Sequence, residues 1–454
     1  MQQLKREVGS ESPYERHVNP QWVRLLEVIG LDVEYVTCRG TELFTADGRR
    51  ILDFNSGYCV HNVGHNHPRV VQALRDELDR NGPAMLQGHV PELAGELAAR
   101  LCARAGGRAN KVFFASSGSE GVEAAIKFAR AHTRRAGLLA ASGAFHGLTC
   151  GALSLMDNAF WRDGFGPLLA DATSVPFGDL DALGAALSTK RYAIFVVEPI
   201  QAEAGVQVPS REYLQGAQAL CRRTGTLFVV DEVQTGFYRT GSFLAAQHFG
   251  LEPDMVVLAK ALSGGLVPVG AVLMSDPIYE SVYTSFKRAI VHTSTYSENA
   301  LAMRAGLATM DVLEDEALGA RAARLGDWLR AELRSRLAGF AMVREVRGLG
   351  MLSAIEFGPP RSLRLRIPFE AFRRVHPAMF GQVLVMHLFK DRGIFSQICG
   401  NHFMSLKVAP ALVVTESQLG EYLDAVESVV AAMEGSLRFW NEALGMAGRV
   451  LHVV

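Results

Sequence analysis

The chain has 454 residues, of which 49% are hydrophobic and 20% charged, an ordinary globular composition with material for a large core and more than one domain. The formal net charge is -1 and no basic stripe is visible, so nucleic acid and an anionic membrane surface are poor candidates for the main partner. The six cysteines show no metal-binding spacing, and no apolar run approaches the roughly 20 residues of a membrane helix. We therefore expect a soluble, cytoplasmic protein with reduced thiols and no metal site.

The N-terminal region predicts a β-hairpin over residues 40–54. Its sequence, GTELFTADGRRILDF, places two strand-like runs on either side of Asp47 and Gly48. An Asp-Gly pair between such runs is a strong signal for a tight hairpin turn.

From residue 111 onward, strand-like and helix-like segments alternate. Buried strands are predicted at the apolar runs 111–115, 192–200, 226–233 and 255–260. A helix is expected directly after the first of these runs, and another over 211–223. This alternation predicts an α/β fold with a mostly parallel sheet covered by helices on both faces. Ligands of such folds gather at the carboxyl ends of the strands.

After about residue 310 the pattern changes. A long amphipathic helix is predicted over 318–339, strand-like sequence over 343–357, and a further helix from Glu416. We expect a large domain over residues 60–310 and a smaller α+β domain built from both termini, residues 1–59 and 311–454.

Lys260 stands at the end of the apolar run MVVLAK, where lysine is rare. Burial disfavours the ammonium form and lowers the pKa of an amine, which suits a lysine that forms a Schiff base with a carbonyl. The alternative is a lysine that lies just past the strand end and reaches solvent.

Asp231 ends the run that precedes Lys260 in the chain, within the sequence VVDEVQTG. A buried carboxylate is costly unless a positive group or hydrogen-bond donors accompany it. A protonated pyridine nitrogen would be such a partner.

Two further segments add a phosphate cup and an aromatic ring. SSGSEG follows the strand at 111–115 and opens a helix, whose free N–H groups and dipole favour a phosphate, although a serine-rich helix cap has the same appearance. Phe145 lies in GAFHGLT, and taken alone it could equally be a core residue. An amine, a carboxylate, a phosphate cup and an aromatic plate together describe a pyridoxal phosphate (PLP) pocket.

With these motifs the chain resembles the class III (subgroup II) aminotransferases of PLP fold type I, which include ornithine, acetylornithine, 4-aminobutyrate and putrescine aminotransferases. The resemblance extends over nearly the whole chain, and its most diagnostic part is VVDEVQTGFYRTG followed by PDMVVLAKALSGGLVPVGA. It implies that Lys260 forms the Schiff base with PLP and moves the catalytic proton. Asp231 would pair with the pyridine nitrogen, Val233 and Phe145 would pack on the ring faces, and Gln234 would lie near the phenolic oxygen.

The resemblance also implies the rest of the cofactor shell. Ser117, Gly118 and Ser119 would hold the phosphate, and His146 would belong to the same shell. Thr295 of HTSTYSEN would reach the phosphate from the other subunit of a homodimer, although a plain turn hydroxyl is the alternative.

The substrate side departs from the family pattern. Members that recognise an α-carboxylate usually do so with an arginine in a LRxxPPL segment, which a residue such as Glu203 can mask. Here the segment is LKVAPAL, with Lys407 at the arginine position, and an ammonium cannot make the two-pronged contact of a guanidinium. Tyr58 aligns with a substrate-lining aromatic position, although it could also be core.

The chain carries a stretch, residues 361–402, that distinguishes it from shorter family members. This stretch is more apolar than a surface loop should be. Its apolar residues could line the substrate entrance or provide extra core for the smaller domain or a dimer contact. They are Phe369, Phe372, Phe380, Val383 and Leu384.

These observations predict a PLP-dependent aminotransferase with a ping-pong cycle, which transfers an amino group from an amine or ω-amino donor to a keto acid or aldehyde acceptor. A PLP-dependent amino-acid racemase or epimerase of the same fold is the alternative, because such enzymes share the same lysine and aspartate. A catalytically silent PLP-binding regulator is disfavoured, since no basic N-terminal domain is present.

Overall fold

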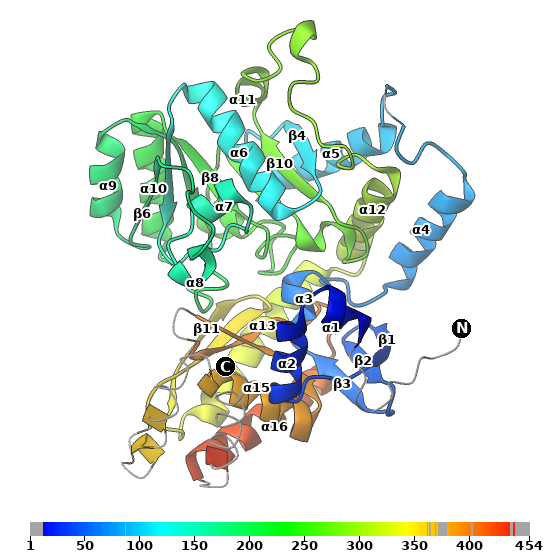
Figure 1. Cartoon of the computed structure of the whole chain (residues 1–454), viewed down its shortest axis with the longest axis vertical. Helices are drawn as coiled ribbons and strands as arrows, with labels where there is room; N and C mark the ends of the chain where they lie inside the picture. The colour runs from blue at the N-terminus through cyan, green and yellow to red at the C-terminus, as the bar shows by residue number, and fades with distance from the viewer. Residues whose placement is uncertain are drawn as a thin grey trace.

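The computed structural model describes residues 12–86, 88–360, 362, 365–367, 369–370, 379–400, 403–435 and 439–440. Figure 1 shows two stacked bodies, the upper one built around a large sheet and the lower one around smaller sheets and long helices. Among the described residues, no helix combines the length and the apolar character needed to cross a membrane.

The upper body contains a seven-stranded sheet with the order β4-β10-β9-β8-β7-β5-β6. β10 runs antiparallel to both of its neighbours, whereas the remaining neighbouring pairs are parallel. This confirms the predicted mostly parallel sheet. The strands are β4 (Lys111–Ala115), β5 (Gly137–Ala141), β6 (Ala172–Val175), β7 (Tyr192–Val197), β8 (Leu227–Asp231), β9 (Met255–Leu258) and β10 (Gly270–Met274).

Helices cover both faces of this sheet because its strands are apolar on both sides. Along β7, Phe195 and Val197 pack into one hydrophobic cluster, while Ile194 and Val196 pack into another. Helices α5 (Glu92–Ala105), α9 (Leu180–Ser188), α10 (Arg211–Thr224) and α12 (Ala300–Asp315) contribute to the first cluster. Helices α6 (Gly118–Thr133), α7 (Cys150–Ser154) and α11 (Asp276–Glu280) contribute to the second.

The lower body joins sequence from both ends of the chain. The predicted hairpin forms from β2 (Glu42–Thr45) and β3 (Arg50–Asp53), flanked by β1 (Tyr35–Arg39), and β3 pairs in parallel with the distant β13 (Ile394–Phe395). A second sheet has the order β11-β12-β15-β14, from β11 (Val343–Leu349), β12 (Leu352–Phe357), β14 (Gln397–Cys399) and β15 (Ser405–Val408). The domain boundaries at 59/60 and 310/311 stay a prediction.

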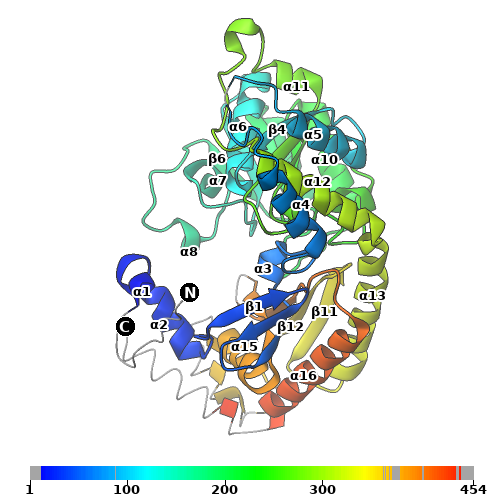
Figure 2. The same ribbon diagram turned by 90° about the vertical axis from the view of Figure 1, so that its right-hand side faces the viewer.

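The remaining helices and 3-10 turns belong to both bodies, and the rotated view in Figure 2 shows α3 (Ser56–Cys59) and α13 (Leu318–Leu337) where the two bodies meet. They are α1 (Pro13–His17), α2 (Pro20–Ile29), α3 (Ser56–Cys59), α4 (Pro68–Asp79), α8 (Ala159–Arg162), α13 (Leu318–Leu337), α15 (Met379–Arg392) and α16 (Glu416–Gly435), together with the 3-10 turns η1 (Ala245–Phe249), η2 (Lys260–Ser263) and η3 (Phe286–Arg288). The helices predicted over 211–223, over 318–339 and from Glu416 are therefore confirmed.

Arg239 ties the two bodies together from a fully buried position. Its Nη1 donates to the backbone oxygens of Met351 at 3.0 Å and Pro410 at 2.5 Å, and its Nη2 donates to Asn62 Oδ1 at 2.6 Å. The Arg239 Nε is buried without a hydrogen-bond partner among the described residues, but the donors of its two Nη atoms are satisfied by groups of the lower body and the segment before α4. Because buried donors need partners, this contact holds the two bodies in their relative position.

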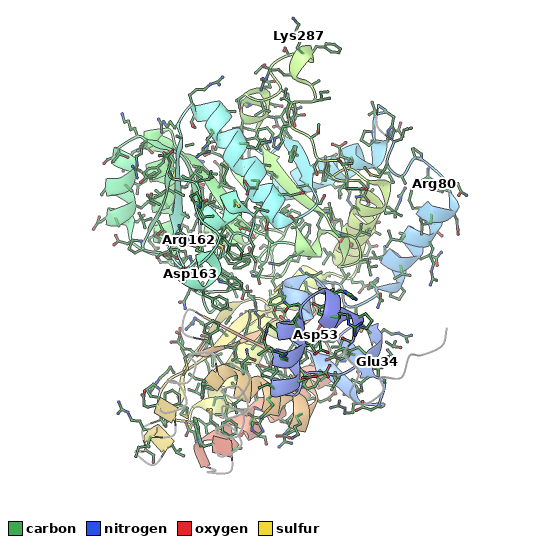
Figure 3. All side chains as sticks on the ribbon, viewed as in Figure 1. Glu34, Asp53, Arg80, Arg162, Asp163 and Lys287 are labelled. Atoms are coloured by element: carbon green, nitrogen blue, oxygen red, sulfur yellow. The ribbon has the colours of Figure 1, made fainter. Side chains whose placement is uncertain are left out.

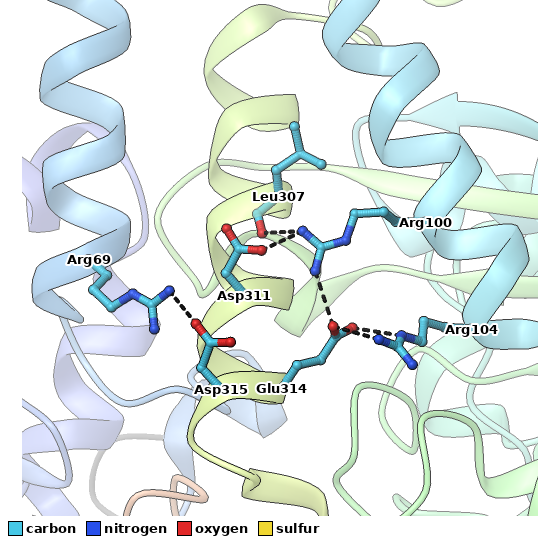
Figure 4. Close-up of polar contacts among 7 residues, drawn as sticks. All are labelled: Arg69, Arg100, Arg104, Leu307, Asp311, Glu314 and Asp315. Carbon is cyan, nitrogen blue, oxygen red and sulfur yellow. Dashed lines mark hydrogen bonds and ion pairs between the residues drawn. The ribbon is translucent and has the colours of Figure 1, made fainter.

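Ion pairs on the outer side fix α12 against its neighbours (Figure 4). Arg100 Nη1 lies 2.5 Å from Asp311 Oδ1, Arg104 Nη2 lies 2.7 Å from Glu314 Oε2, and Arg69 Nη2 of α4 lies 2.7 Å from Asp315 Oδ2. These side chains are partly exposed, so each pair contributes little to stability by itself.

In the stretch 361–402, most of the apolar side chains predicted to line an entrance are core, whereas Ile367 is 72% exposed. Phe369, Phe380, Val383 and Leu384 are buried, and the rings of Phe369 and Phe380 pack against Trp440. This favours the structural interpretation over the substrate entrance for these four side chains. Phe372 lies outside the described residues.

Candidate active site

A cavity of about 480 Å³ opens where β7, β8 and β9 end and where α6 begins. Parallel strands direct their carboxyl ends to the same edge of a sheet, which is why residues distant in the chain meet there. The cavity is lined by Val60, Ser116, Ser117, Gly118, Ser119, Phe145, His146, Gly147, Glu198, Asp231, Val233, Gln234, Ala259, Lys260, Ser263, Gly265, Leu266, Val267, Pro268 and Val269.

The predicted phosphate cup forms one wall of this cavity at the N-terminus of α6. Ser117 is the N-cap, and its hydroxyl accepts a hydrogen bond from Glu120 N at 3.2 Å, so the capping interpretation also holds. A Cβ at Gly118 would lie 3.0 Å from Val233 Cγ2, so a larger residue there would fit only if the Val233 side chain shifted. The N–H groups of this first turn are close to the cavity and suit an anion.

Asp231 and His146 form a buried pair on the cavity wall. His146 Nδ1 lies 2.8 Å from Asp231 Oδ2, and Val233 N donates to Asp231 Oδ1 at 3.0 Å. Burial opposes charge on His146, but the hydrogen bond to Asp231 and the charge of that carboxylate raise the imidazole pKa. His146 Nε2 is buried and has no hydrogen-bond partner among the described residues.

Glu198 is a cavity residue that the sequence interpretation missed. Its carboxylate accepts from Phe145 N at 3.0 Å and from Ala202 N at 3.2 Å, and burial raises its pKa to about 7. The signal was available, because Glu198 follows the buried run of β7 just as Asp231 ends the run of β8.

Lys260 lies two residues beyond the end of β9, so the prediction that it ends the strand was wrong. The strand stops at Leu258, and Lys260 opens η2 with a φ of 46°, a left-handed conformation that non-glycine residues rarely adopt. Its side chain is partly exposed and lines the cavity, and desolvation lowers its pKa despite the nearby carboxylates of Glu203 and Asp231. The strands predicted to 200 and 233 likewise end earlier, at Val197 and Asp231.

The predicted substrate residues form a second polar group next to the cavity. Lys407 Nζ donates to Glu203 Oε1 at 2.6 Å, and Gln234 Nε2 donates to the same oxygen at 2.9 Å. Gln397, which the sequence interpretation did not single out, donates to Glu203 Oε2 at 3.3 Å. The Lys407 ammonium lies 5.3 Å from the centre of the Tyr58 ring. The structure therefore brings Tyr58, Glu203 and Lys407 together, and Gln234 connects them to the cavity.

Thr295 is separated from this cavity within one chain. It is exposed and lines a different hollow of about 1090 Å³, together with residues such as Glu77, His89 and Tyr283. The prediction that Thr295 acts in a neighbouring subunit stays a prediction, because the structure contains a single chain.

The residues that line the cavity fit PLP in their chemistry. Gly118 has no side chain, so the backbone N–H groups at the N-terminus of α6 stay accessible to an anion. The buried Nε2 of His146 has no hydrogen-bond partner among the described residues, as expected of a site that takes a polar aromatic ligand. Phe145 and Val233 offer apolar surfaces, while Asp231 and Lys260 offer the carboxylate and the amine.

Comparisons with known proteins agree with this geometry. Residues 29–430 match the family described as aminotransferase class-III. The chain is similar to aminotransferase PigE of Serratia sp., with 34% identity over 447 residues that cover 92% of this chain and 52% of the relative. The chain thus spans about half the length of that curated relative.

Two further proteins are covered over most of their length. Putrescine aminotransferase of Pectobacterium atrosepticum is 34% identical over 440 residues, which cover 94% of this chain and 89% of the relative. A solved structure of ornithine aminotransferase from Toxoplasma gondii, with partial occupancy of PLP at its active site, has a TM-score of 0.79 and 30% identity, covering 88% of this chain and 90% of that one. None of these three favours the racemase alternative. The chain therefore belongs to the class-III aminotransferases, the PLP-dependent transaminases of fold type I, and its cofactor is pyridoxal 5'-phosphate.

Proposed function

We propose that this chain transfers an amino group from an aliphatic primary amine or ω-amino donor to a keto acid or aldehyde acceptor in a ping-pong cycle. The observation that carries the proposal is the convergence of Lys260, Asp231 and the first turn of α6 on one cavity. The similarity to a putrescine aminotransferase supports an amine donor. When bound, PLP supplies an electron sink for the charge that develops on the reacting substrate carbon.

Lys260 is assigned to hold the cofactor and to move the proton at the reacting carbon. A lowered pKa increases the fraction of its Nζ that is a free amine at neutral pH, and only the free amine can take up a proton. The turn at η2 fixes its backbone at the edge of the cavity, so the side chain needs little rearrangement to act.

Asp231 is assigned to orient the cofactor ring and to hold the proton on the ring nitrogen. His146 and Val233 N each donate to one of its oxygens, which fixes the plane of the carboxylate before any ligand binds. Ser117, Gly118 and Ser119 are assigned to the phosphate, and Phe145 and Val233 to the ring faces.

The Glu203–Lys407 pair supports donors without an α-carboxylate. Lys407 is only 1% exposed and its ammonium is bound to Glu203, Gln234 and the Tyr58 ring, so a substrate carboxylate would have to displace a buried ion pair and would then meet a single-point donor. Lys407→Arg should restore a two-pronged contact and improve kcat/KM for dicarboxylate acceptors about tenfold, with little change for amine donors.

The half-reaction tests the proposal directly. Holoenzyme mixed with putrescine, hexylamine or ornithine in the absence of an acceptor should release one equivalent of carbonyl product per active site, measured by mass spectrometry. A racemase would release none. Release with none of the three, or with an α-amino acid that has no ω-amine, such as alanine, in their place, would contradict the proposed donor class.

We also propose that two copies share their active sites. η3 lies on a projection of the upper body whose tip carries Lys287 (Figure 3). Phe286 is 96% exposed and Ile290 is 81% exposed on this segment, which is unusual for large apolar side chains unless a partner covers them. Thr295 follows in the same segment, at the edge of the second hollow.

Size determination by analytical ultracentrifugation tests the dimer, and variants test the shared site. Thr295→Ala should weaken PLP binding, whereas Thr293→Ala, at an exposed position in the same hollow, should not. A monomer that binds PLP with full affinity would overturn the proposal.

A further inference from the structure

A row of four aromatic rings connects the cofactor cavity with the lower body. Phe145, which lines the cavity, meets Trp161 with ring centres 5.3 Å apart, and Trp161 meets Phe160 at 4.8 Å. Phe160 meets Phe403 at 6.2 Å. All three contacts are edge-to-face, with interplanar angles of 77°, 85° and 76°, the arrangement that aromatic pairs favour.

The row crosses from the upper to the lower body. Phe160 and Trp161 belong to α8, which hangs from the upper body, and Figure 3 shows the labelled neighbours Arg162 and Asp163 at its lower edge, above the strands of the lower body. Phe403 lies between β14 and β15 in the lower body. The fold therefore places a row of rings that starts at the cavity residue Phe145 and crosses the boundary between the two bodies.

The far end of this wall is attached to the polar group that holds Lys407. Gly400 N donates to the backbone oxygen of Glu203 at 2.8 Å, and Phe403 N donates to Gly400 O at 2.9 Å. The segment that carries Phe403 is thus fixed to the same residue that neutralises Lys407. A ligand that extends from Lys260 along this wall meets ring surfaces and a charge that is already paired.

The exposure of Phe160 indicates that its ring is available to a ligand. Its side chain is 63% exposed although it sits between two other rings. Phe160 is not part of the cavity lining and is joined to the lining residue Phe145 through the Trp161 ring. A large exposed ring at this position suits a ligand of apolar chemistry that extends out of the cavity, because contact with the ring removes apolar surface of both from water.

We propose that Phe160, Trp161 and Phe403 form the specificity wall for an unbranched aliphatic chain carried by the substrate of this enzyme. The proposal rests on the proposed function for the reaction itself and adds which residues select the chain. Binding should strengthen with each methylene that the wall covers, by up to about fourfold per methylene when the group is fully buried.

The test compares two exposed phenylalanines, one within α8 and one shortly after it. Phe160→Ala removes a ring from the wall, whereas Phe165→Ala removes an equally exposed ring, at 65%, that makes no ring contact with the described aromatic residues. Both positions are exposed, so neither substitution should unfold the protein. The donors are propylamine, butylamine, hexylamine and octylamine with the holoenzyme.

In the parent and in Phe165→Ala, KM should fall as the chain lengthens, while kcat stays within about twofold. In Phe160→Ala, KM for octylamine should rise about tenfold and KM for propylamine should change less than about twofold, because the short chain does not reach the ring. A loss that is equal for all four amines, or equal in both variants, would overturn the proposal.

Calorimetric binding of octan-1-ol to the holoenzyme separates this proposal from the proposed function. The alcohol has the chain without the amine, so it tests the wall even if no amine is turned over. Weaker binding to Phe160→Ala than to Phe165→Ala supports the wall. Equal binding to the two variants overturns it.

Discussion

Two lysines in and beside the same cavity have opposite electrostatic environments. Desolvation acts on both, yet it lowers the pKa of Lys260, whereas the pKa of Lys407 is raised because Glu203 lies in direct contact with its ammonium. The carboxylates of Glu203 and Asp231 act on the pKa of Lys260 by their charge alone, without a hydrogen bond to its ammonium among the described contacts. The comparison teaches that a contacting carboxylate, more than burial, decides whether a lysine here serves as an amine or as a fixed cation.

The strongest way to break the comparison is to remove each lysine in turn. Lys260→Ala should abolish turnover and the borohydride-reducible link to PLP, because Lys260 is the amine assigned to that link. Lys407→Ala should keep the link and alter substrate preference. Retention of the covalent link in Lys260→Ala, measured by mass spectrometry after reduction, would falsify the assignment.

Asp231 provides the next largest effect. Asp231→Asn keeps the size of the side chain but removes the charge that faces the cofactor ring and His146, so kcat/KM should fall by several orders of magnitude, at about 1.4 kcal/mol for each tenfold. His146 should also lose its raised pKa, which NMR titration of the imidazole would detect. Activity within about tenfold of the parent would mean that another carboxylate has this role.

Glu203→Gln should convert Lys407 into an unpaired buried cation. Removing one partner of such a buried pair lowers the free energy of unfolding by about 3–5 kcal/mol near neutral pH. The pKa of Lys407 should then fall below its unfolded value, so the folded state binds fewer protons and stability should rise with pH toward 10.5.

In the parent, the stability contributed by this pair should not depend on pH between 4.5 and 10.5. Burial opposes the charge of Glu203, but Lys407 lowers its pKa below 4.5, so its contribution is lost only as pH falls through that lowered value. The raised pKa of Lys407 means that its contribution is lost as pH rises above 10.5. Chemical denaturation across this range should give a plateau for the parent, and a plateau for Glu203→Gln would refute the pairing argument.

The smallest effect is expected at an exposed ion pair, where desolvation is nearly absent. Arg69 and Asp315 lie 2.7 Å apart with about half of each side chain exposed, so Arg69→Ala should change the unfolding free energy by less than about 1 kcal/mol. Urea denaturation at low and high salt would measure it. A loss comparable to that of Glu203→Gln would show that burial does not govern these charges.

Much of the fold and the cofactor side of the site followed from local sequence patterns. The apolar runs predicted β4, β7, β8 and β9 to within a few residues, because strand burial leaves a continuous apolar signature. Asp231 and Lys260 were identifiable because polar residues at the ends of such runs are rare. Glu198 was missed although the same rule applies to it.

The substrate side could not be predicted in this way. Phe160 and Trp161 carry no periodic signal in a short helix. The apolar stretch 361–402, interpreted from the sequence as either a substrate entrance or extra core, contains Phe369 and Phe380 as core. Whether an aromatic side chain is exposed, as Phe160 is, or buried, as Phe369 is, depends on which elements its segment packs against.

The sequence by itself determined the alternation of strands and helices, and it placed an amine and a carboxylate at the same edge of a parallel sheet, because strand length and burial are encoded locally. Only the tertiary structure decided that Lys407 meets Glu203, 204 residues earlier in the chain, and that Phe403 meets Phe160 across the two bodies. Such contacts are set by how the two bodies pack, and packing depends on the whole core at once instead of on any local pattern.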